Sequence, residues 1–376
     1  MWSRRYGQLL RAGNCVDGQS RVRTNCEEFH ATGQLRAEAE WLMGKGDVRV
    51  AVFGAGAHAV TQHIPNLLAN GGAEIVAICD INEQAAQAAA QQFGIAAVHT
   101  DGLEMVDAGG FDAMWSMVPA PARPVVEIAA ADKGIHIFCE KPQTMDMKQG
   151  LELDAALRRS GALGTVCFRE RYRPLFQEAK RLLADKEIVH IRFQMPTSLP
   201  AQPPPDNWEP RIELFDNYLG WGPHAIDYCR FVSGLDVVRA QAFSHQSDGY
   251  YVPLSTSAHF VMSNGATATV NFTQVSQSGP PNEPYFLFYY EGGYLGVHPG
   301  YSHIEMNGET VYEAEDFQPW RELDRVFIEA IRSGDDSQLL NDYHDGLKTL
   351  APLLAAYDSA SQGGGEVIDV EAYIKG

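Results

Sequence analysis

A glycine-rich segment early in the chain has the spacing of a phosphate-binding loop. Gly54 permits a tight turn after an apolar strand, Gly56 lets a pyrophosphate approach the backbone, and Ala59 allows close packing of the next helix. A second apolar run ends 26 residues after Gly54 in an acidic residue, Asp80. Together these features predict a dinucleotide-binding site formed by Gly54, Gly56, Ala57, His58, Ala59 and Asp80.

The carboxylate of Asp80 indicates which dinucleotide is preferred. An acid at this position accepts hydrogen bonds from the ribose diol and repels a 2′-phosphate, so the sequence favours NAD over NADP. Backbone N–H groups and a helix N-terminus can hold the phosphates without net positive charge. The alternative interpretation is an ordinary strand-to-helix turn that binds no ligand.

The tripeptide Glu140-Lys141-Pro142 follows another apolar run, residues 135–139. A lysine between an acid and a proline is most often part of a solvated turn. The carboxyl ends of parallel strands, however, face the ligand crevice of a doubly wound sheet. We therefore expect Lys141 to point to the place where a nicotinamide would lie.

Residues 220–228, GWGPHAIDY, contain the other group suited to acid–base chemistry. The glycines and Pro223 predict a loop, and Ala225, Cys229 and Val232 share one face of the helix that should follow it. His224 lies near the predicted helix start. Such a histidine is often a capping or packing residue, but its pKa near neutrality also makes it a candidate general base.

The elements that must position these residues alternate between strands and helices up to about residue 163. This alternation is typical of a parallel doubly wound sheet, that is, an α/β Rossmann domain. Asn82 can cap an alanine-rich helix that stops at Gly94. The predicted strands are residues 48–53, 74–80, 113–118 and 135–139.

After residue 163 the predicted strands are longer and alternate in polarity. Asn264-Gly265 and Asn307-Gly308 lie between such runs and indicate hairpins. We expect an α+β domain with a mainly antiparallel open sheet, completed by helices near 320–332 and 343–362. The predicted divisions are a poorly specified leader at 1–46, a Rossmann domain at 47–163, and a substrate and oligomerisation domain at 164–376.

Charge and composition exclude several classes of partner. The chain carries 48 acidic and 29 basic residues, a net charge of −19, which disfavours nucleic acids and anionic membranes. No apolar run reaches the 18 residues that a membrane span needs. The six cysteines form no C-x-x-C pair, so we expect a reducing, cytoplasmic setting without disulfides or a metal site.

The leader supports two hypotheses. Met43 stands five residues before the first strand, so it could be the natural start of the protein. Alternatively, the leader is a helical arm that wraps a neighbouring subunit.

Taken in order, these motifs resemble the Gfo/Idh/MocA oxidoreductase family, named after glucose–fructose oxidoreductase and inositol dehydrogenase. The resemblance covers residues 47–376. It rests on the glycine loop and on six further elements: His63-Ile64-Pro65, Pro119, Glu140-Lys141-Pro142, Arg171-Tyr172-Arg173-Pro174, Gly222-x-His224-x-x-Asp227 and residues 356–360.

The resemblance implies NAD(P)-dependent oxidation of a sugar, cyclitol or similar polyol. It implies that Lys141 and His224 are catalytic, that the Lys141–Pro142 bond is often cis, and that the subunits form a homodimer or homotetramer through the open sheet. It also implies cofactor contacts at Pro119, Glu140 and Lys141. The residues expected to contact the substrate are Arg171, Tyr172, Trp221 and Asp227.

Two positions depart from the family pattern. Gly220 stands four residues before His224, where the family has an acid that works with the histidine, and Arg123 stands where the family commonly has histidine. Asp216, Tyr172 and Arg171 are candidates to compensate. Trp221 is either a stacking surface for a sugar ring or a packed aromatic residue.

Three functions are compatible with these motifs. The first is an NAD-dependent dehydrogenase that acts on a sugar-like polyol. The second is a redox-neutral enzyme that oxidises its substrate transiently in order to cleave a glycoside or invert a centre. The third is a regulatory protein that binds NAD without catalysis.

Overall fold

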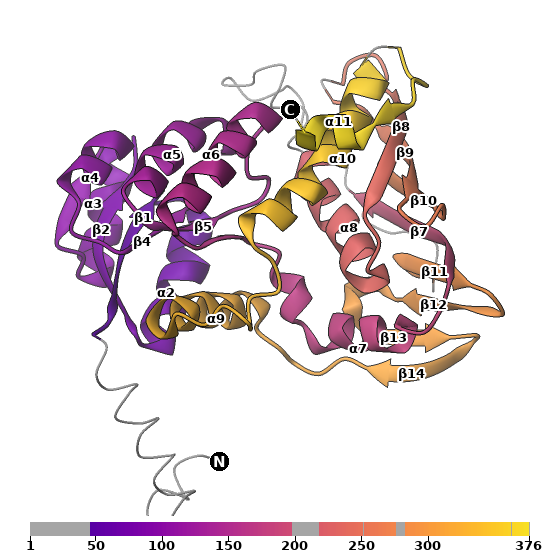
Figure 1. Ribbon diagram of the computed structural model, residues 1–376, viewed down its shortest axis with the longest axis horizontal. Coiled ribbons are helices and arrows are strands. Elements are labelled where there is room, and N and C mark those ends of the chain that lie inside the picture. The colour runs from indigo at the N-terminus through magenta and orange to yellow at the C-terminus, as the bar shows by residue number, and fades with distance from the viewer. Residues whose placement is uncertain (1–45, 198–217, 251, 276–282, 362, 376) are drawn as a thin grey trace, which may run out of the picture. The chain divides into compact units, whose positions relative to one another are not determined.

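The computed structural model describes residues 46–197, 218–250, 252–275, 283–361 and 363–375. Two sheets organise this part of the chain (Figure 1). The first has six parallel strands in the order β3-β2-β1-β4-β5-β6. Its strands are β1 (Val48–Phe53), β2 (Ala73–Cys79), β3 (Ala97–His99), β4 (Ala113–Ser116), β5 (His136–Cys139) and β6 (Gly164–Val166).

The helices of this half are η1 (Ala59–His63), α2 (Ile64–Asn70), α3 (Glu83–Phe93), α4 (Gly102–Ala108), η2 (Ala120–Ala122), α5 (Pro124–Asp132) and α6 (Met147–Ser160). Helix α3 confirms its predicted bounds. The Asn82 side chain accepts a hydrogen bond from the Ala85 N–H, and Gly94 ends the helix at a left-handed φ of 73°. The central strands are apolar because helices cover both faces of the sheet, and the side chains of β4 are all buried.

Within the described ranges the second sheet has nine strands in the order β14-β13-β12-β11-β7-β10-β9-β8-β15, of which only the β7–β10 pair is parallel. The predicted mainly antiparallel sheet is therefore confirmed. The strands are β7 (Ile188–Thr197), β8 (Val237–His245), β9 (Ser255–Met262), β10 (Thr267–Gln274), β11 (Phe286–Tyr290), β12 (Gly293–Val297), β13 (His303–Met306), β14 (Glu309–Glu313) and β15 (Ile368–Asp369).

Both predicted Asn-Gly hairpins are present. Asn307 and Gly308 join β13 to β14 with φ values of 52° and 89°, as a tight two-residue hairpin requires. At the β9–β10 turn, φ is positive at Gly265 but not at Asn264.

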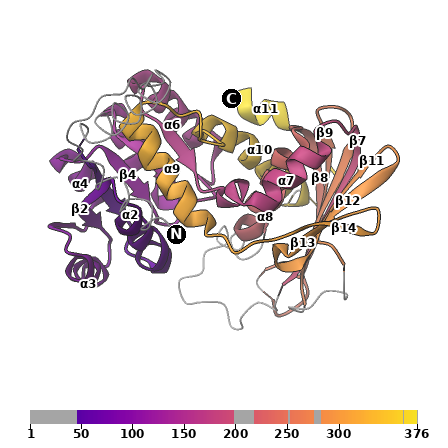
Figure 2. The same cartoon turned by 90° about the horizontal axis from the view of Figure 1, so that it is seen from below.

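Helices cover only one face of the second sheet among the described elements (Figures 1 and 2). The remaining helices of the described residues are η3 (Arg169–Tyr172), α7 (Pro174–Leu183), α8 (Tyr218–Ser233), η5 (Pro299–Tyr301), α9 (Pro319–Ser333), α10 (Tyr343–Ser361) and α11 (Val370–Lys375). Strand β10 alternates between buried and more exposed residues, which fits a sheet with one open face.

Helix α9 packs on the first sheet although it lies late in the chain (Figure 2). Arg321 donates to Asn70 at the end of α2 at 2.8 Å, and the Phe327 ring centroid lies 5.4 Å from that of Trp115 in β4. The C-terminal part of the chain therefore contributes to the packing of the Rossmann sheet.

One predicted element is wrong. Residues 220–223 were expected to form a loop, but α8 already begins at Tyr218 and runs through Pro223. Pro223 lacks an N–H, which removes one backbone hydrogen bond from the helix. Burial of the same segment compensates, because Ala225 and Ile226 are 0% and 1% exposed.

No helix of the described residues is long and apolar enough to span a membrane. The described cysteines, Cys79, Cys139, Cys167 and Cys229, are buried and carry free thiols.

Candidate active site

The glycine loop connects β1 to η1 at the carboxyl edge of the first sheet. Gly54 has a φ of +115°, and a Cβ there would lie 3.0 Å from the Val118 backbone nitrogen, so only glycine fits. At Gly56 a Cβ would meet nothing within 4 Å, which leaves space for a ligand to approach the backbone. Ala57 and His58 are exposed and Ala59 is buried, as the predicted loop requires.

Asp80 ties this loop to the end of β2. Its Oδ2 accepts a hydrogen bond from the Ala55 N–H at 2.7 Å, and its Oδ1 accepts one from the Asn82 N–H at 2.8 Å. The next residue, Ile81, is an apolar side chain with 93% exposure. The sequence reasoning did not single out Ile81, although an apolar residue directly after the acid was visible.

The Glu140-Lys141-Pro142 turn follows β5, and its Lys141–Pro142 bond is cis, as the resemblance implied. Glu140 is buried and accepts a hydrogen bond from the Lys141 backbone N–H at 3.0 Å. Burial lowers the pKa of the Lys141 side chain, an effect that Glu140 opposes and Arg169 reinforces. Pro119 is exposed just beyond the end of β4.

A chain of buried charged and polar residues connects the Glu140-Lys141-Pro142 turn to α9. His63 Nδ1 lies 2.8 Å from Asp324 Oδ1, and His63 Nε2 lies 3.4 Å from Glu140 Oε1. Trp115 donates to the same Asp324 oxygen at 2.9 Å. Although burial alone would lower the pKa of His63, the two carboxylates hold it well above its usual value. An imidazolium thus joins α9 to Glu140, and His58 Nδ1 lies 4.0 Å from the same Glu140 oxygen.

Arg123 fixes the same turn from its other side. Its Nε donates to the Val118 carbonyl at 2.5 Å, and its Nη1 donates to the carbonyls of Glu140 and Pro142, the latter at 3.0 Å. Burial alone would lower the pKa of Arg123, but buried Cys139 and then Glu127, one helical turn later, raise it. The arginine that departs from the family pattern therefore holds the backbone on both sides of Lys141.

His224 lies on α8 and is 3% exposed. Its Nδ1 is buried and has no hydrogen-bond partner among the described residues. The pKa of His224 is well below its usual value, first because of burial and then because of the charges of Lys141 and Arg169. The rings of Trp221 and Tyr228 lie 5.7 and 5.8 Å from it. The structure thus brings Lys141, His224 and Trp221 into one neighbourhood.

Three of the predicted substrate residues make hydrogen bonds or ion pairs within the protein. Arg171 donates from Nε to both oxygens of Asp227 at 3.0 and 3.1 Å and pairs with Asp345 at 2.7 Å. The hydroxyl of Tyr172 accepts a hydrogen bond from the Leu340 N–H at 3.0 Å. These contacts join η3, α8 and α10, so a substrate role for Arg171, Tyr172 and Asp227 stays a prediction. Asp216 lies outside the described residues.

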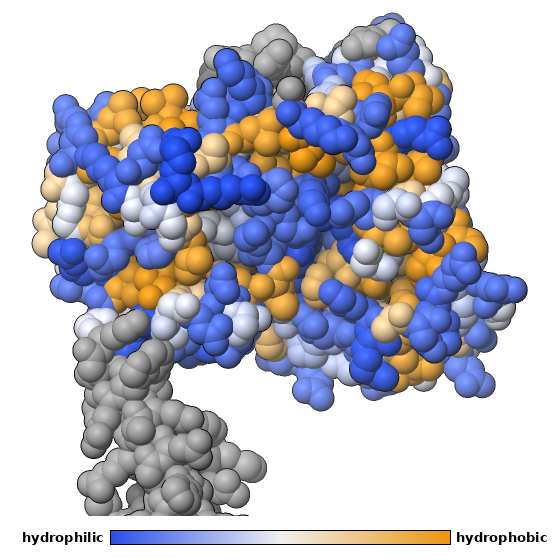
Figure 3. All heavy atoms as spheres, viewed as in Figure 1, coloured by the Kyte–Doolittle hydropathy of each residue, from blue (hydrophilic) through white to orange (hydrophobic). Residues whose placement is uncertain are grey.

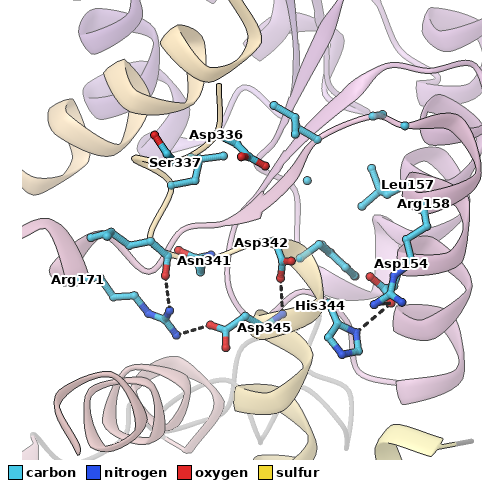
Figure 4. Close-up of a pocket in the computed structure, with 17 residues that line it drawn as sticks. Asp154, Leu157, Arg158, Arg171, Asp336, Ser337, Asn341, Asp342, His344 and Asp345 are labelled. Carbon is cyan, nitrogen blue, oxygen red and sulfur yellow. Dashed lines mark hydrogen bonds and ion pairs between the residues drawn. The ribbon is translucent and has the colours of Figure 1, made fainter. Parts of the chain in front are cut away.

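Arg171 also lines a separate pocket of about 590 Å³ (Figure 4). Figure 4 shows its guanidinium turned to Asp345, and its Nη1 also donates to the Leu340 carbonyl at 2.6 Å. His344 hydrogen-bonds Asp154 on the other side of the pocket. Hydrophilic side chains gather on the molecular surface around the start of α10 (Figure 3). The pocket lies beside Gly164, where β6 begins.

The fold and these side chains define an oxidoreductase of the NAD-binding Rossmann class. Residues 48–168 match the family model described as an oxidoreductase family with an NAD-binding Rossmann fold. Residues 176–295 match the model of the GFO/IDH/MocA C-terminal domain. The chain belongs to the Gfo/Idh/MocA family, which confirms the resemblance and the prediction of an NAD-binding oxidoreductase.

Similar proteins include D-apiose dehydrogenase from Paraburkholderia graminis, 27% identical over 78% of this chain and 82% of that protein. The scyllo-inositol 2-dehydrogenase (NAD(+)) of Bacillus subtilis is 30% identical over 50% of this chain and 55% of its own length. An oxidoreductase from Agrobacterium radiobacter, solved with NAD+, L-tartaric acid and magnesium, shares the fold. Its TM-score is 0.72 at 21% identity, covering 87% of this chain and 99% of that one.

Proposed function

We propose that this protein is an NAD-dependent dehydrogenase that oxidises a hydroxyl-bearing carbon of a sugar-like polyol. The observation that carries the proposal is the meeting of Lys141, from the carboxyl edge of the first sheet, with His224 from α8. The charge of Lys141 lowers the pKa of His224, and Lys141 follows β5 at the same carboxyl edge as the glycine loop that follows β1. Curated relatives named as apiose and inositol dehydrogenases support the same class of substrate.

The residues of the loop fit a dinucleotide. Gly54, Gly56, Ala57, His58 and Ala59 offer an open backbone to the pyrophosphate, and Asp80 offers its carboxylate to the ribose diol. The exposed Ile81 offers an apolar surface to the adenine ring. We assign Pro119, Glu140 and Lys141 to the nicotinamide end.

The chemistry divides between two side chains of this chain. When bound, NAD supplies the acceptor for the hydride that leaves the substrate carbon. Lys141 donates a hydrogen bond to the substrate oxygen and stabilises developing negative charge on it. His224 is neutral and accepts the hydroxyl proton, so the alcohol becomes a carbonyl. We place Trp221 against the sugar ring, and a substrate role for Arg171, Tyr172 and Asp227 stays a prediction.

The test is absorbance at 340 nm after the purified protein is mixed with NAD and a panel of sugars, cyclitols and sugar acids. A rise with at least one compound supports the proposal. NAD that stays bound until denaturation, with product but no net NADH, would contradict it in favour of the redox-neutral enzyme. NAD binding without any turnover would favour the regulatory protein.

A further inference from the structure

A second cation lies at the carboxyl edge of the first sheet. Arg169 opens η3, three residues after β6 ends. Its guanidinium carbon lies 3.8 Å from the ring centroid of Trp320, and the Trp320 ring lies 6.4 Å from that of His58 in the glycine loop. Arg169 therefore lies close to the predicted cofactor loop, on the edge that also carries Lys141.

The described residues leave most N–H donors of Arg169 without a hydrogen bond. Its side chain is only 13% exposed, and its Nε is buried without a hydrogen bond. Within the described ranges its one carboxylate contact joins Nε to Glu170 Oε1 at 3.2 Å. A guanidinium has five N–H donors, and leaving buried donors unpaired costs free energy.

The neighbouring carboxylates are already shared. Glu170 also pairs with Arg173 at 2.5 Å, so one carboxylate serves two guanidinium groups. Glu140 pairs with His63 and accepts the Lys141 N–H. The charge of Arg169 lowers the pKa of both Lys141 and His224. This part of the site thus carries more positive than negative charge, and the N–H donors of Arg169 are suited to bind an anion.

We propose that the substrate is a sugar acid whose carboxylate binds Arg169 while its reacting hydroxyl lies between Lys141 and His224. The inference rests on the dehydrogenase function proposed above. A planar guanidinium held flat on Trp320 suits bidentate recognition of a carboxylate. The bound carboxylate also offsets the positive charge that depresses the basicity of His224.

The experiment compares matched pairs that differ in one carboxylate: galactose with galacturonate and glucose with glucuronate. NADH formation at 340 nm gives kcat and KM for each compound. We expect kcat/KM for an acid to exceed that of its neutral partner by about 10- to 100-fold, as a hydrogen-bonded charge contributes. A neutral sugar that reacts as well as its acid would overturn the inference and leave the dehydrogenase function standing. No reaction with any compound would instead remove the proposed function.

Variants then assign the effect to one side chain. Arg169→Gln should raise KM for the acid about 10-fold or more and leave the Kd for NAD within about threefold, and Arg169→Lys should retain part of the preference. Arg173→Gln is the matched control, because it removes the other arginine bound to Glu170 and should leave the preference intact. A higher Kd for NAD in Arg169→Gln with an unchanged preference for the acid would assign Arg169 to the cofactor and overturn the inference. Thermal unfolding with NAD shows whether each variant folds.

Discussion

At the scale of single residues, the surroundings of His224 and Lys141 displace both pKa values downward. Burial is the largest cause in each case, and neighbouring positive charge adds to it. A histidine whose pKa is well below its usual value is neutral at physiological pH and can accept a proton. A lysine whose pKa is lowered loses its proton at a lower pH than an exposed lysine would.

These directions predict an unusual pH profile. Because His224 is already neutral, kcat/KM should stay nearly level as the pH falls from about 8 to about 6.5, where an ordinary histidine begins to protonate. The rate should decline on the alkaline side as Lys141 loses its proton, below the usual lysine value of about 10.4. Initial rates of NADH formation across the pH range provide the measurement. An acid limb centred near pH 6.5 would contradict the account of His224.

Asp80 provides a test of cofactor preference. Its carboxylate accepts hydrogen bonds from two backbone N–H groups, so Asp80→Asn keeps an acceptor while removing the charge. The substitution should raise the Kd for NAD about 10-fold. The Kd for NADP should stay unchanged or fall, because repulsion of the 2′-phosphate is lost. Fluorescence titration with both dinucleotides measures the two Kd values. An unaltered ratio would remove Asp80 from ribose recognition.

At the scale of elements, α9 is joined to the catalytic turn by the pair of Asp324 with His63. Because the folded-state pKa of His63 is raised, its contribution to the free energy of unfolding is full below about pH 6.5. That contribution is lost as the pH rises through the raised pKa. Docking of α9 should therefore weaken in alkaline solution.

Removal of one charge from this pair should be costly. Asp324→Asn leaves His63 buried with less compensation, so the free energy of unfolding should fall by about 3 kcal/mol. Glu322→Gln, on the same helix in an exposed pair with Arg325, is the control and should cost less than about 1 kcal/mol. Urea unfolding at pH 7 and pH 9 measures both variants. Equal losses for the two would mean that the buried pair does not anchor α9.

Helices and turns could be predicted from the sequence where residues close in sequence determine the backbone conformation. Asn82, Gly94 and the Asn307-Gly308 turn act through neighbouring backbone, and the structure confirms all of them. The loop predicted at 220–223 was wrong because packing of α8 outweighs the local preference of glycine and proline.

The site was only partly predictable for the same reason. The motif residues Lys141 and His224 stand out by type and position. Asp324 is linked to Glu140 through His63, but Asp324 and His63 are 261 residues apart in sequence. The spacing of residues in a local motif cannot predict such a contact. The buried pairing of Arg171 with Asp227 was equally invisible from their types alone.

At the scale of the whole molecule, the open face of the nine-stranded sheet lacks a covering helix among the described elements. Residues on this face include Thr269 and Asn271 of β10. We propose that a second copy of the chain covers it, giving a homodimer or homotetramer. If the chain divides after residues 46 and 163, as we propose, this open face belongs to the domain of residues 164–376.

Charged residues on the open face should block that assembly. The double variant Thr269→Arg and Asn271→Arg should elute as a monomer of 41.4 kDa, while the unaltered protein elutes at a multiple of this mass. Gln91→Arg, on the exposed side of α3, is the control and should leave the mass unchanged. Light scattering coupled to size-exclusion chromatography gives the masses. A monomeric unaltered protein would contradict the proposal.

The central claim is that Lys141 acts on a substrate oxygen beside bound NAD. The most direct test measures NADH formation and the Kd for NAD in the Lys141→Ala variant. The account predicts a loss of about 10²- to 10⁴-fold in kcat, as for removal of a positioned acid–base group, with a Kd within about threefold of the unaltered protein. Unimpaired turnover by this variant would contradict the account.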